Sequence, residues 1–461
     1  MLQARNGRPT GMNRIPIYGI VLLCACMTLS SLEGCAFEDI AAKDIHNQTN
    51  LSYKNLAGVD LSHAHLCRSD LSAANLAGSD LSHAKLRSSQ LTNTNLSSTI
   101  LKMADLSGAE LIGCIFAKVD LSNADLSRVH ADNTTFKRSN STGAILAGSE
   151  IIDSDLDFAD LTNSDLRRCS ISNSTLAGAK LCSANFKEAR LSKVNLSNAN
   201  LRGADCTGMT VEDSNLKGAD LTGARLVNAN MNSIDIKGVY LVNANMQGVR
   251  LNYANLSASY LYNGEFARAE FSGANLSKAD LGGSDLARTR MMWTNLVGAN
   301  LNDANLDYSD LTGANLTGAA LQRASFANTV MERAVLRRAD MKGVRLYDIK
   351  FNGTDMSHSD LRMDHFQGTQ FVNVDLSYAN LRGATLEDCI LKNVNLTGAD
   401  LTGAALKNVM LKDVNFKDTN LTRAKLDNAT IKRIAEGSAN GQINLDSAIL
   451  EGDLRMELKF K

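Results

Sequence analysis

Proline is nearly absent from this 461-residue sequence, which contains only Pro9 and Pro16, both close to its start. Because proline lacks a backbone N–H, its absence from the rest of the chain suits a β-structure in which each N–H joins a ladder. Aromatic residues are also scarce, at 5%, although such rings dominate many protein cores. The two absences together favour a regular β-structure with a narrow interior.

The sequence also lacks a surplus of either charge, with 48 Lys and Arg against 49 Asp and Glu. This balance suggests neither a nucleic-acid-binding protein nor a strong mimic of nucleic acid. Catalytic signatures are missing as well: the seven His residues are scattered, and we find no Gly-rich phosphate loop, nucleophile elbow or cysteines at zinc-ligand spacing. We therefore predict no enzymatic activity, no cofactor and no metal site.

A five-residue repeat occupies most of the chain. From Leu51 to Ile431, every fifth residue is Leu, Phe, Met or Ile at all but four of 77 positions, and the frame never slips. The four exceptions are Ala131, Ser141, Cys206 and Val211. Self-similarity at a fixed period is the signature of a repeat architecture, in which each unit packs only on its neighbours.

A period of five fits neither a helix nor a continuous strand. It fits a very short strand followed by a corner, so that the chain changes direction at every unit. On a strand, the repeat centre and the residue two before it share a side. That second position carries small residues, such as Ala104, Ala274 and Thr294. We therefore expect one large and one small side chain to fill the interior at each side of the coil.

The pentads 219–223 (Ala-Asp-Leu-Thr-Gly) and 314–318 (Ala-Asn-Leu-Thr-Gly) carry the clearest form of the repeat. The pattern resembles the pentapeptide-repeat family, whose consensus is Ala-(Asp/Asn)-Leu-X-X, over residues 49–431. The resemblance implies an all-β fold, a right-handed quadrilateral β-helix of about 19 coils with short helical or irregular caps. It also implies two activities seen in the family: mimicry of duplex DNA by binders of type II topoisomerases, and delivery into a host cell as an effector.

The first 35 residues have the form of a secretory leader. Arg5, Arg8 and Arg14 precede an apolar run from Ile15 to Leu29, which is shorter than the roughly 20 residues that span a membrane. Met12 is an alternative start, because it would give a more compact leader. We interpret residues 1–35 as a signal peptide.

Two cysteines in the leader resemble the modified cysteine of a bacterial lipoprotein box. Cys26 ends the sequence Leu-Cys-Ala-Cys, and Cys35 ends Leu-Glu-Gly-Cys. Both are lipidation candidates; ordinary signal cleavage and an unprocessed leader are the alternatives. A lipidated cysteine that carries a diacyl and an amide-linked chain would anchor the protein firmly, because stable anchoring needs two signals.

The ends of the repeat need covers, since an open coil exposes unpaired backbone groups. We interpret residues 36–50 as an N-terminal cap or tether, 51–431 as the β-helix and 432–461 as a C-terminal cap. Within the last part, Thr430 could cap a short helix from Ile431 to Ala435, ending near Gly437.

The residue before each centre is often Asn on one side of the coil and Asp on the next. One interpretation is an acidic stripe that imitates a phosphate backbone. The other is that these short side chains bond the backbone of the following corner, as Asx turns do, and we favour it because Lys342, Arg362 and Arg382 lie close to the stripe.

Aromatic residues on the outer positions are the candidate partner contacts. They are Tyr240, Tyr253, Tyr260, Tyr262 and Trp293. Tyr240 and Tyr260 are one coil apart, and Trp293 lies two coils beyond Tyr253 with Gly273 between them. The alternative is that these rings only stack on each other.

Asp364 breaks the interior pattern, because it stands where a small inward residue is expected. A buried carboxylate is costly unless it is hydrogen-bonded. Asp364 is thus either part of a ligand or proton site with His365, or turned outward by a local bulge, and we favour the bulge.

These features together predict a non-enzymatic, envelope-anchored repeat scaffold that mediates protein–protein or surface interaction. The expected partners are an unidentified protein and, through the lipid anchor, a membrane; nucleic acid is not expected. The alternatives are a DNA-mimicking gyrase binder of the quinolone-resistance type and an effector delivered into a host cell, with secreted or cytoplasmic localisation. The sequence does not indicate the oligomeric state.

Overall fold

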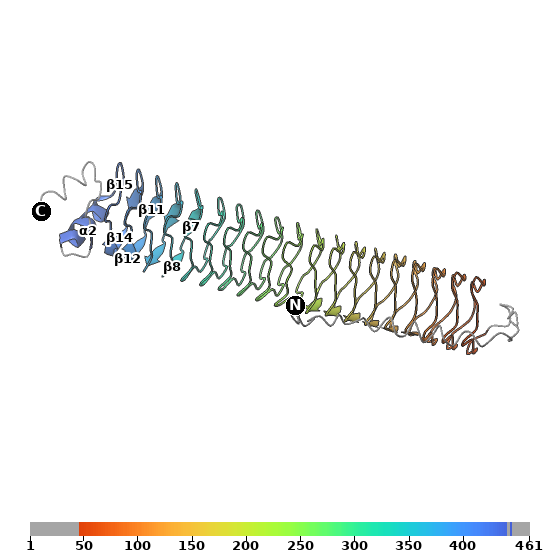
Figure 1. The fold of residues 1–461 in the computed structure, drawn as a ribbon. Coiled ribbons are helices and arrows are strands. Elements are labelled where there is room, and N and C mark those ends of the chain that lie inside the picture. Colours follow the sequence, from red (N-terminus) through yellow and green to blue (C-terminus); the bar gives the residue numbers. More distant parts are fainter. Residues whose placement is uncertain (1–45, 440–442, 445–461) are drawn as a thin grey trace, which may run out of the picture. The chain divides into compact units, whose positions relative to one another are not determined.

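The computed structural model describes residues 46–439 and 443–444. In this part of the chain, residues pair in parallel with partners twenty positions further along, from Asn50↔Asp70 to Asp400↔Asn420. Four five-residue sides therefore make one coil, and the coils stack one behind another (Figure 1). The parallel β-helix that the sequence predicts is confirmed.

In three regions, the short sides of successive coils pair regularly enough to form parallel β-sheets. The first contains β1 (Glu110–Ile112), β2 (His130–Asp132), β3 (Glu150–Ile152), β4 (Ser170–Ser172), β5 (Arg190–Ser192) and β6 (Thr210–Glu212). The second contains β8 (Lys350–Asn352), β10 (Gln370–Val372), β12 (Ile390–Asn395), β14 (Met410–Asn415) and β16 (Ile443–Asn444). The third contains β7 (Arg345–Tyr347), β9 (His365–Gln367), β11 (Thr385–Glu387), β13 (Ala405–Lys407) and β15 (Lys425–Leu426).

The pentad 271–275 illustrates how each unit satisfies its backbone. All five of its N–H groups donate hydrogen bonds: Phe271 to Arg290 O (2.7 Å), Ser272 to Asn252 Oδ1 (3.0 Å), Gly273 to Met292 O (2.8 Å), Ala274 to Phe271 O (2.9 Å) and Asn275 to Ala254 O (2.8 Å). The third residue has a positive φ of 68°, the conformation that a type II turn requires at that position. A proline anywhere in such a unit would remove one of these bonds, which explains its absence from the repeats.

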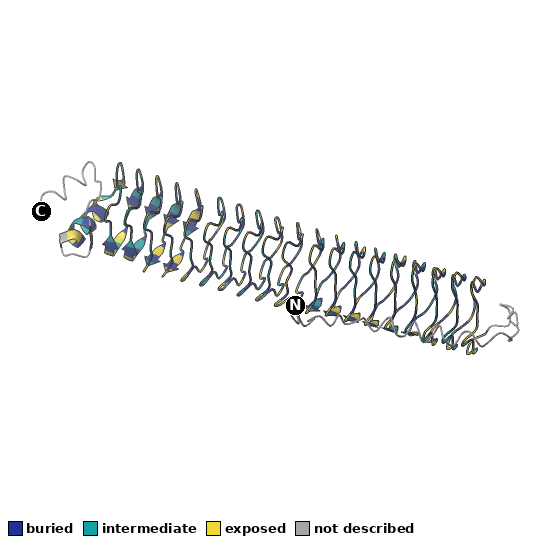
Figure 2. Ribbon diagram, in the orientation of Figure 1, coloured by how far each residue is buried: buried dark blue, intermediate teal, exposed yellow. Residues whose placement is uncertain are grey.

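The interior has the large-and-small composition that the period predicts. Phe271 is fully buried and Ala274 is 1% exposed, so the centre and the residue two before the next centre both point inward. Figure 2 shows buried residues lining the inside of successive coils, with exposed residues on the corners. The four irregular centres are buried as well. Near the small centre Cys206, the longer side chain of Met209 is also buried and helps to fill the interior.

The helix α2 (Asn428–Ala439) follows the last coil. It begins three residues earlier than the sequence interpretation placed it, and its capping residue is Asp427 rather than Thr430. The Thr430 N–H donates to Asp427 Oδ1 at 2.8 Å, the bond that a side chain at the cap position makes. Thr430 itself is buried, and its hydroxyl oxygen accepts from the Val409 N–H at 3.1 Å. A residue of the helix thus provides a hydrogen-bond acceptor for the backbone N–H of Val409 in the last coil.

Several sequence predictions lie outside the described residues. They are the leader with Cys26 and Cys35, the segment 36–45 and the tail from residue 445 onward. Within the described part of the chain, the search for a helix both long and apolar enough to cross a membrane found none.

Replacement of Ala274 by Phe tests the inward assignment. The extra volume has no room beside Phe271, so we expect the variant to lose about 1–3 kcal/mol of unfolding free energy, measured by urea unfolding. Ala287→Phe is the matched control, because Ala287 faces outward at a position equivalent to Tyr347, three coils later. Equal stability of Ala274→Phe and the wild type would contradict the assignment.

Candidate binding surface

The five candidate aromatic residues fall into two groups on different sides of the coil. Tyr240, Tyr260 and Tyr262 flank the buried centres Leu241 and Leu261. Tyr253 and Trp293 occupy a corner two sides away, at the turn position two residues after a centre. We call the first group the tyrosine stack and the second the aromatic corner.

The rings of the tyrosine stack cover each other. Tyr240 and Tyr260 pair across adjacent coils, and their ring centroids lie 4.8 Å apart with the planes only 4° from parallel. Both residues remain about 45% exposed, but the face of each ring that meets its partner is occupied. The self-stacking that the sequence left as an alternative therefore occurs for this pair.

The aromatic corner is more open. Tyr253 is 73% and Trp293 is 61% exposed, and both have a positive φ close to 60°. Each ring leans over the next coil, where Gly273 lies below Tyr253 and Gly313 lies below Trp293. A Cβ on Gly273 would stand only 2.6 Å from the tyrosine ring, so glycine is required there for space. The positive φ alone does not require it, because Tyr253 and Trp293 adopt a positive φ at the equivalent position.

Other corners also carry aromatic side chains that the sequence analysis did not single out, and on one of them Tyr378 stacks on His358 with the ring centres 5.1 Å apart. Phe158 leans over Gly178 and Tyr378 over Gly398, while Arg288 lies 5.3 Å from the ring centre of Tyr308. The signal that could have found the first two is an aromatic residue twenty positions before a glycine. Covering a glycine with a ring in this way stabilises adjacent β-structure.

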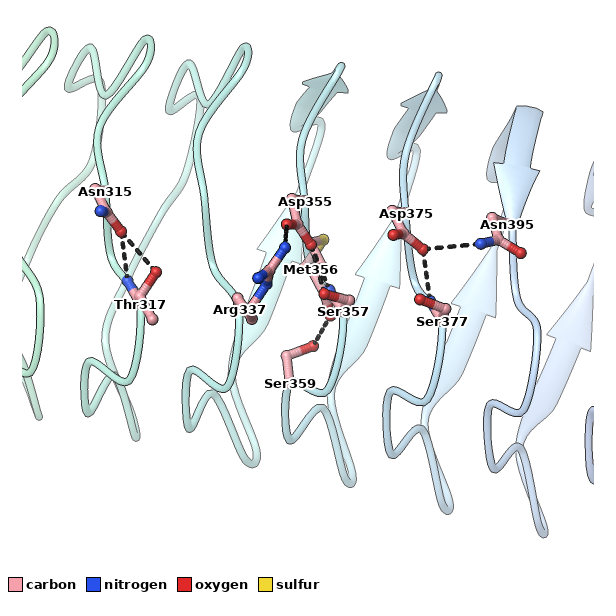
Figure 3. Close-up of polar contacts among 10 residues, drawn as sticks. All are labelled: Asn315, Thr317, Arg337, Asp355, Met356, Ser357, Ser359, Asp375, Ser377 and Asn395. Carbon is pink, nitrogen blue, oxygen red and sulfur yellow. Dashed lines mark hydrogen bonds and ion pairs between the residues drawn. The ribbon is translucent and has the colours of Figure 1, made fainter.

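The asparagines and aspartates before the centres bond the corner backbone, as the Asx interpretation predicts. Figure 3 shows Asn315 accepting from the Thr317 N–H at 3.1 Å and from its hydroxyl at 2.6 Å. The same side chains also bond from coil to coil, as where the Asn395 amide donates to Asp375 at 3.1 Å. The result is a polar ladder along the stacked coils, in which each side chain has a defined orientation.

Basic residues pair with aspartates on three sides of the coil. A Lys or Arg just after a centre pairs with an Asp eighteen residues further on, outside the acidic column, in Arg87–Asp105, Lys137–Asp155, Lys187–Asp205 and Arg337–Asp355. In the acidic column itself, the ion pairs are Lys180–Asp160, Arg202–Asp220, Arg362–Asp360 and Arg382–Asp400. Partial burial raises the pKa of Asp355, but hydrogen bonds from Ser357 and the Arg337 guanidinium outweigh it and hold that pKa below its usual value. The stripe is therefore mixed in charge, which argues against an imitation of a phosphate backbone.

The reactive side chains of the described residues do not assemble into a catalytic group. The thiols of Cys114, Cys169 and Cys206 are buried, and burial raises the pKa of each to about 12, so they are poor nucleophiles. Across residues 46–439 and 443–444, a search for three or more His, Cys, Asp or Glu residues placed to hold a metal ion found none.

Asp364 points inward and is 1% exposed, so the outward bulge that we favoured is wrong. The turn before it is regular, with the Asp364 N–H donating to Leu361 O. Its Oδ1 accepts from the Val344 N–H at 2.9 Å, whereas its buried Oδ2 has no hydrogen-bond partner among the described residues. His365 is the next residue along the strand and lies on the other face, where its ring packs edge-on against Tyr347 at 5.8 Å. The two residues therefore do not form a common site.

Burial raises the pKa of Asp364 to about 8, with smaller opposing contributions from the Val344 and Gly343 backbone. A folded-state pKa above the unfolded value means that the bound proton stabilises the fold in acid. This contribution is complete below the ordinary pKa of 3.8 and is lost as the pH rises through about 8.

Asp364→Asn keeps an oxygen for the Val344 N–H but cannot ionise. Between pH 6 and pH 8 we expect the wild type to lose roughly 2 kcal/mol of unfolding free energy relative to this variant, measured by urea unfolding at each pH. Asp360→Asn is the control, because hydrogen bonds from Arg362 hold the pKa of Asp360 low despite its partial burial. Parallel pH profiles for the wild type and Asp364→Asn would show that Asp364 is not a buried acid.

The structure thus defines a protein class, a parallel β-solenoid with five-residue sides and a ladder-bonded polar surface. The chain belongs to the pentapeptide-repeat family. The family profile described as "pentapeptide repeat region" matches residues 149–226 and 364–440. The profile "pentapeptide repeats (8 copies)" matches residues 55–89, 89–128, 125–168, 214–252, 250–288, 285–321 and 314–353. A search of curated proteins found no match.

Solved structures with similarity to this chain include proteins described as pentapeptide-repeat proteins. A protein of the Arabidopsis thaliana thylakoid lumen is 35% identical over 20% of this chain and 65% of its own, with a TM-score of 0.20. HetL, involved in heterocyst differentiation regulation in the cyanobacterium Nostoc, is 29% identical over 61% of this chain and 90% of its own, with a TM-score of 0.15. Full-length QnrB1, a plasmid-mediated fluoroquinolone resistance protein, is 16% identical over 63% of this chain and 90% of its own, with a TM-score of 0.11.

Proposed function

We propose that this protein is a non-enzymatic, envelope-anchored repeat scaffold that mediates protein–protein or surface interaction. The observation that carries the proposal is the contrast between its interior and its surface. Buried hydrophobic side chains fill the coils, whereas Tyr253 and Trp293 stand open on the surface between rows of hydrogen-bonded polar side chains. Exposed aromatic residues in such surroundings are typical contact anchors.

The anchoring half of the proposal is supported by the leader. Three arginines precede the apolar run from Ile15 to Leu29, and the candidate cysteines Cys26 and Cys35 lie within this run and shortly after it. This order is that of an exported protein. Lipidation at either cysteine would leave the whole repeat region on the membrane surface.

The DNA-mimicking alternative receives less support. Such a mimic needs a continuous acidic face, and the Asp column of this protein is interrupted by Tyr240, Tyr260 and Lys180. Its aspartates also form ion pairs such as Arg202–Asp220 at 3.0 Å. Export through the leader would in addition separate the protein from a cytoplasmic topoisomerase.

The mass of the mature N-terminal peptide, from membrane and soluble fractions of the native cell, tests the proposal. We expect this peptide to begin at Cys26 or Cys35, to carry lipid and to occur in the membrane fraction. Replacement of the modified cysteine by serine (Cys26→Ser or Cys35→Ser) should move nearly all of the protein to the soluble fraction, because the acyl chains hold it at the bilayer.

Serine at the other cysteine is the matched control and should leave the distribution unchanged. An intact, unlipidated terminus in the soluble fraction would overturn the anchoring. Purified gyrase would then be the next partner to test.

A further inference from the structure

The two aromatic groups differ in what their rings can contact. In the tyrosine stack, parallel rings 4.8 Å apart cover one another. In the aromatic corner, an edge of each ring lies over a glycine, and most of the side chain remains accessible. A flat partner that stacks on aromatic faces can therefore use Tyr253 and Trp293 far better than Tyr240 and Tyr260.

The aromatic corner also repeats along the stacked coils. Tyr253 and Trp293 occupy equivalent positions two coils apart, with Gly273 between them and Gly313 after them. Two coils correspond to about 9.6 Å at the usual strand spacing. This interval is close to the length of one disaccharide in an extended β-1,4-linked polysaccharide. In such a strand, sugars two units apart present the same face, so both rings would meet equivalent surfaces.

Hydrogen-bonding side chains flank this line of rings on one side. Asn252 donates to Glu270 Oε2 at 3.0 Å and accepts from the Ser272 N–H at 3.0 Å. Glu270 in turn pairs with Arg290 at 3.4 Å. The row therefore offers donors and acceptors that are already held in place, which lowers the entropic cost of binding a polar ligand.

The other flank is an asparagine ladder. The Asn275 amide donates to Asn255 at 3.3 Å, and the Asn295 amide donates to Asn275 at 3.2 Å. Each amide nitrogen carries two hydrogens, and each of these bonds uses one of them. The second N–H can serve a ligand hydroxyl. Both flanks run parallel to the line from Tyr253 to Trp293, because their members also repeat by coil.

We propose that the aromatic corner binds an extended β-1,4-linked polysaccharide strand, with Tyr253 and Trp293 stacking on sugars one disaccharide apart. Sugar rings have apolar C–H faces and a rim of hydroxyls, which correspond to the central rings and the polar flanks. A protein partner would favour a continuous apolar patch, and here glycine separates the two rings. The inference rests on the proposed scaffold function, whose surface partner it names by class, and it does not depend on lipidation.

Intrinsic fluorescence provides a direct test, because Trp293 is the only tryptophan of the chain. Cellohexaose and chitohexaose are titrated into the full chain, purified in detergent, while tryptophan emission and its quenching by iodide are recorded. We expect at least one of these β-1,4-linked hexasaccharides to change the emission saturably and to protect Trp293 from iodide. Tyr253→Ala, which removes one of the two stacking platforms, should weaken the affinity about tenfold.

Two controls distinguish specific binding at this site from non-specific binding. Tyr378→Ala removes an exposed ring that lies over Gly398 and stacks on His358. The positions two coils away in its column are Arg338 and Asp418, so no second platform lies at the disaccharide spacing, and the variant should leave the affinity unchanged. Maltohexaose, whose α-1,4 linkages curl the chain, should not bind.

The inference is overturned if neither β-1,4-linked hexasaccharide alters the emission, if maltohexaose binds equally, or if Tyr253→Ala binds like the wild type. The two proposals can fail independently. If the protein is lipidated but does not bind either hexasaccharide, the anchoring proposal stands and the polysaccharide site is wrong. If it binds a hexasaccharide but is not lipidated, the polysaccharide site stands and the anchoring proposal is wrong.

Discussion

Hydrogen bonding of each five-residue unit to the coils above and below is the constraint on which this structure depends. In the pentad 271–275, four of the five N–H groups reach a neighbouring coil and the fifth closes the turn. An inserted residue would move every following inward side chain off its position, as a slip of register does in any sheet. The unbroken frame from Leu51 to Ile431 and the lack of proline within it are two consequences of this single requirement.

The same stacking organises the surface, because any outward position is repeated every twenty residues. Polar side chains in such a column form hydrogen bonds with the same residue type in the adjacent coil, as in the ladder that joins Asn255, Asn275 and Asn295. Basic residues pair with aspartates of the neighbouring coil, and aromatic side chains lie against another ring, as in Tyr240–Tyr260, against a glycine, as in Tyr253–Gly273, or against an arginine, as in Tyr308–Arg288. Individual exposed ion pairs contribute little, but the repetition gives the surface a defined arrangement of groups along one direction.

A surface built in this way suits a partner that is itself linear and periodic. Tyr253 and Trp293 are spaced by the coil repeat, and the polar rows beside them share that repeat. The fold thereby converts a sequence period into a regular spacing of contact groups. Function in such a protein lies in which side chains occupy the outer columns, because the backbone is nearly identical from coil to coil.

The sequence by itself determined the coil, its interior and the columns, because the direction of each side chain follows from its place in the five-residue period. Ala274 and Phe271 point inward for this local reason, and Tyr253 and Trp293 share a corner. The tertiary structure decided matters that depend on groups a coil away. Asp364 stays inside, where its Oδ1 accepts a hydrogen bond from the Val344 N–H. Asp427 rather than Thr430 caps the helix, because the Thr430 hydroxyl oxygen accepts from the Val409 N–H. Tyr240 stacks because Tyr260 lies twenty positions on, whereas the ring of Trp293 leans over the next coil because Gly313 leaves room for it there.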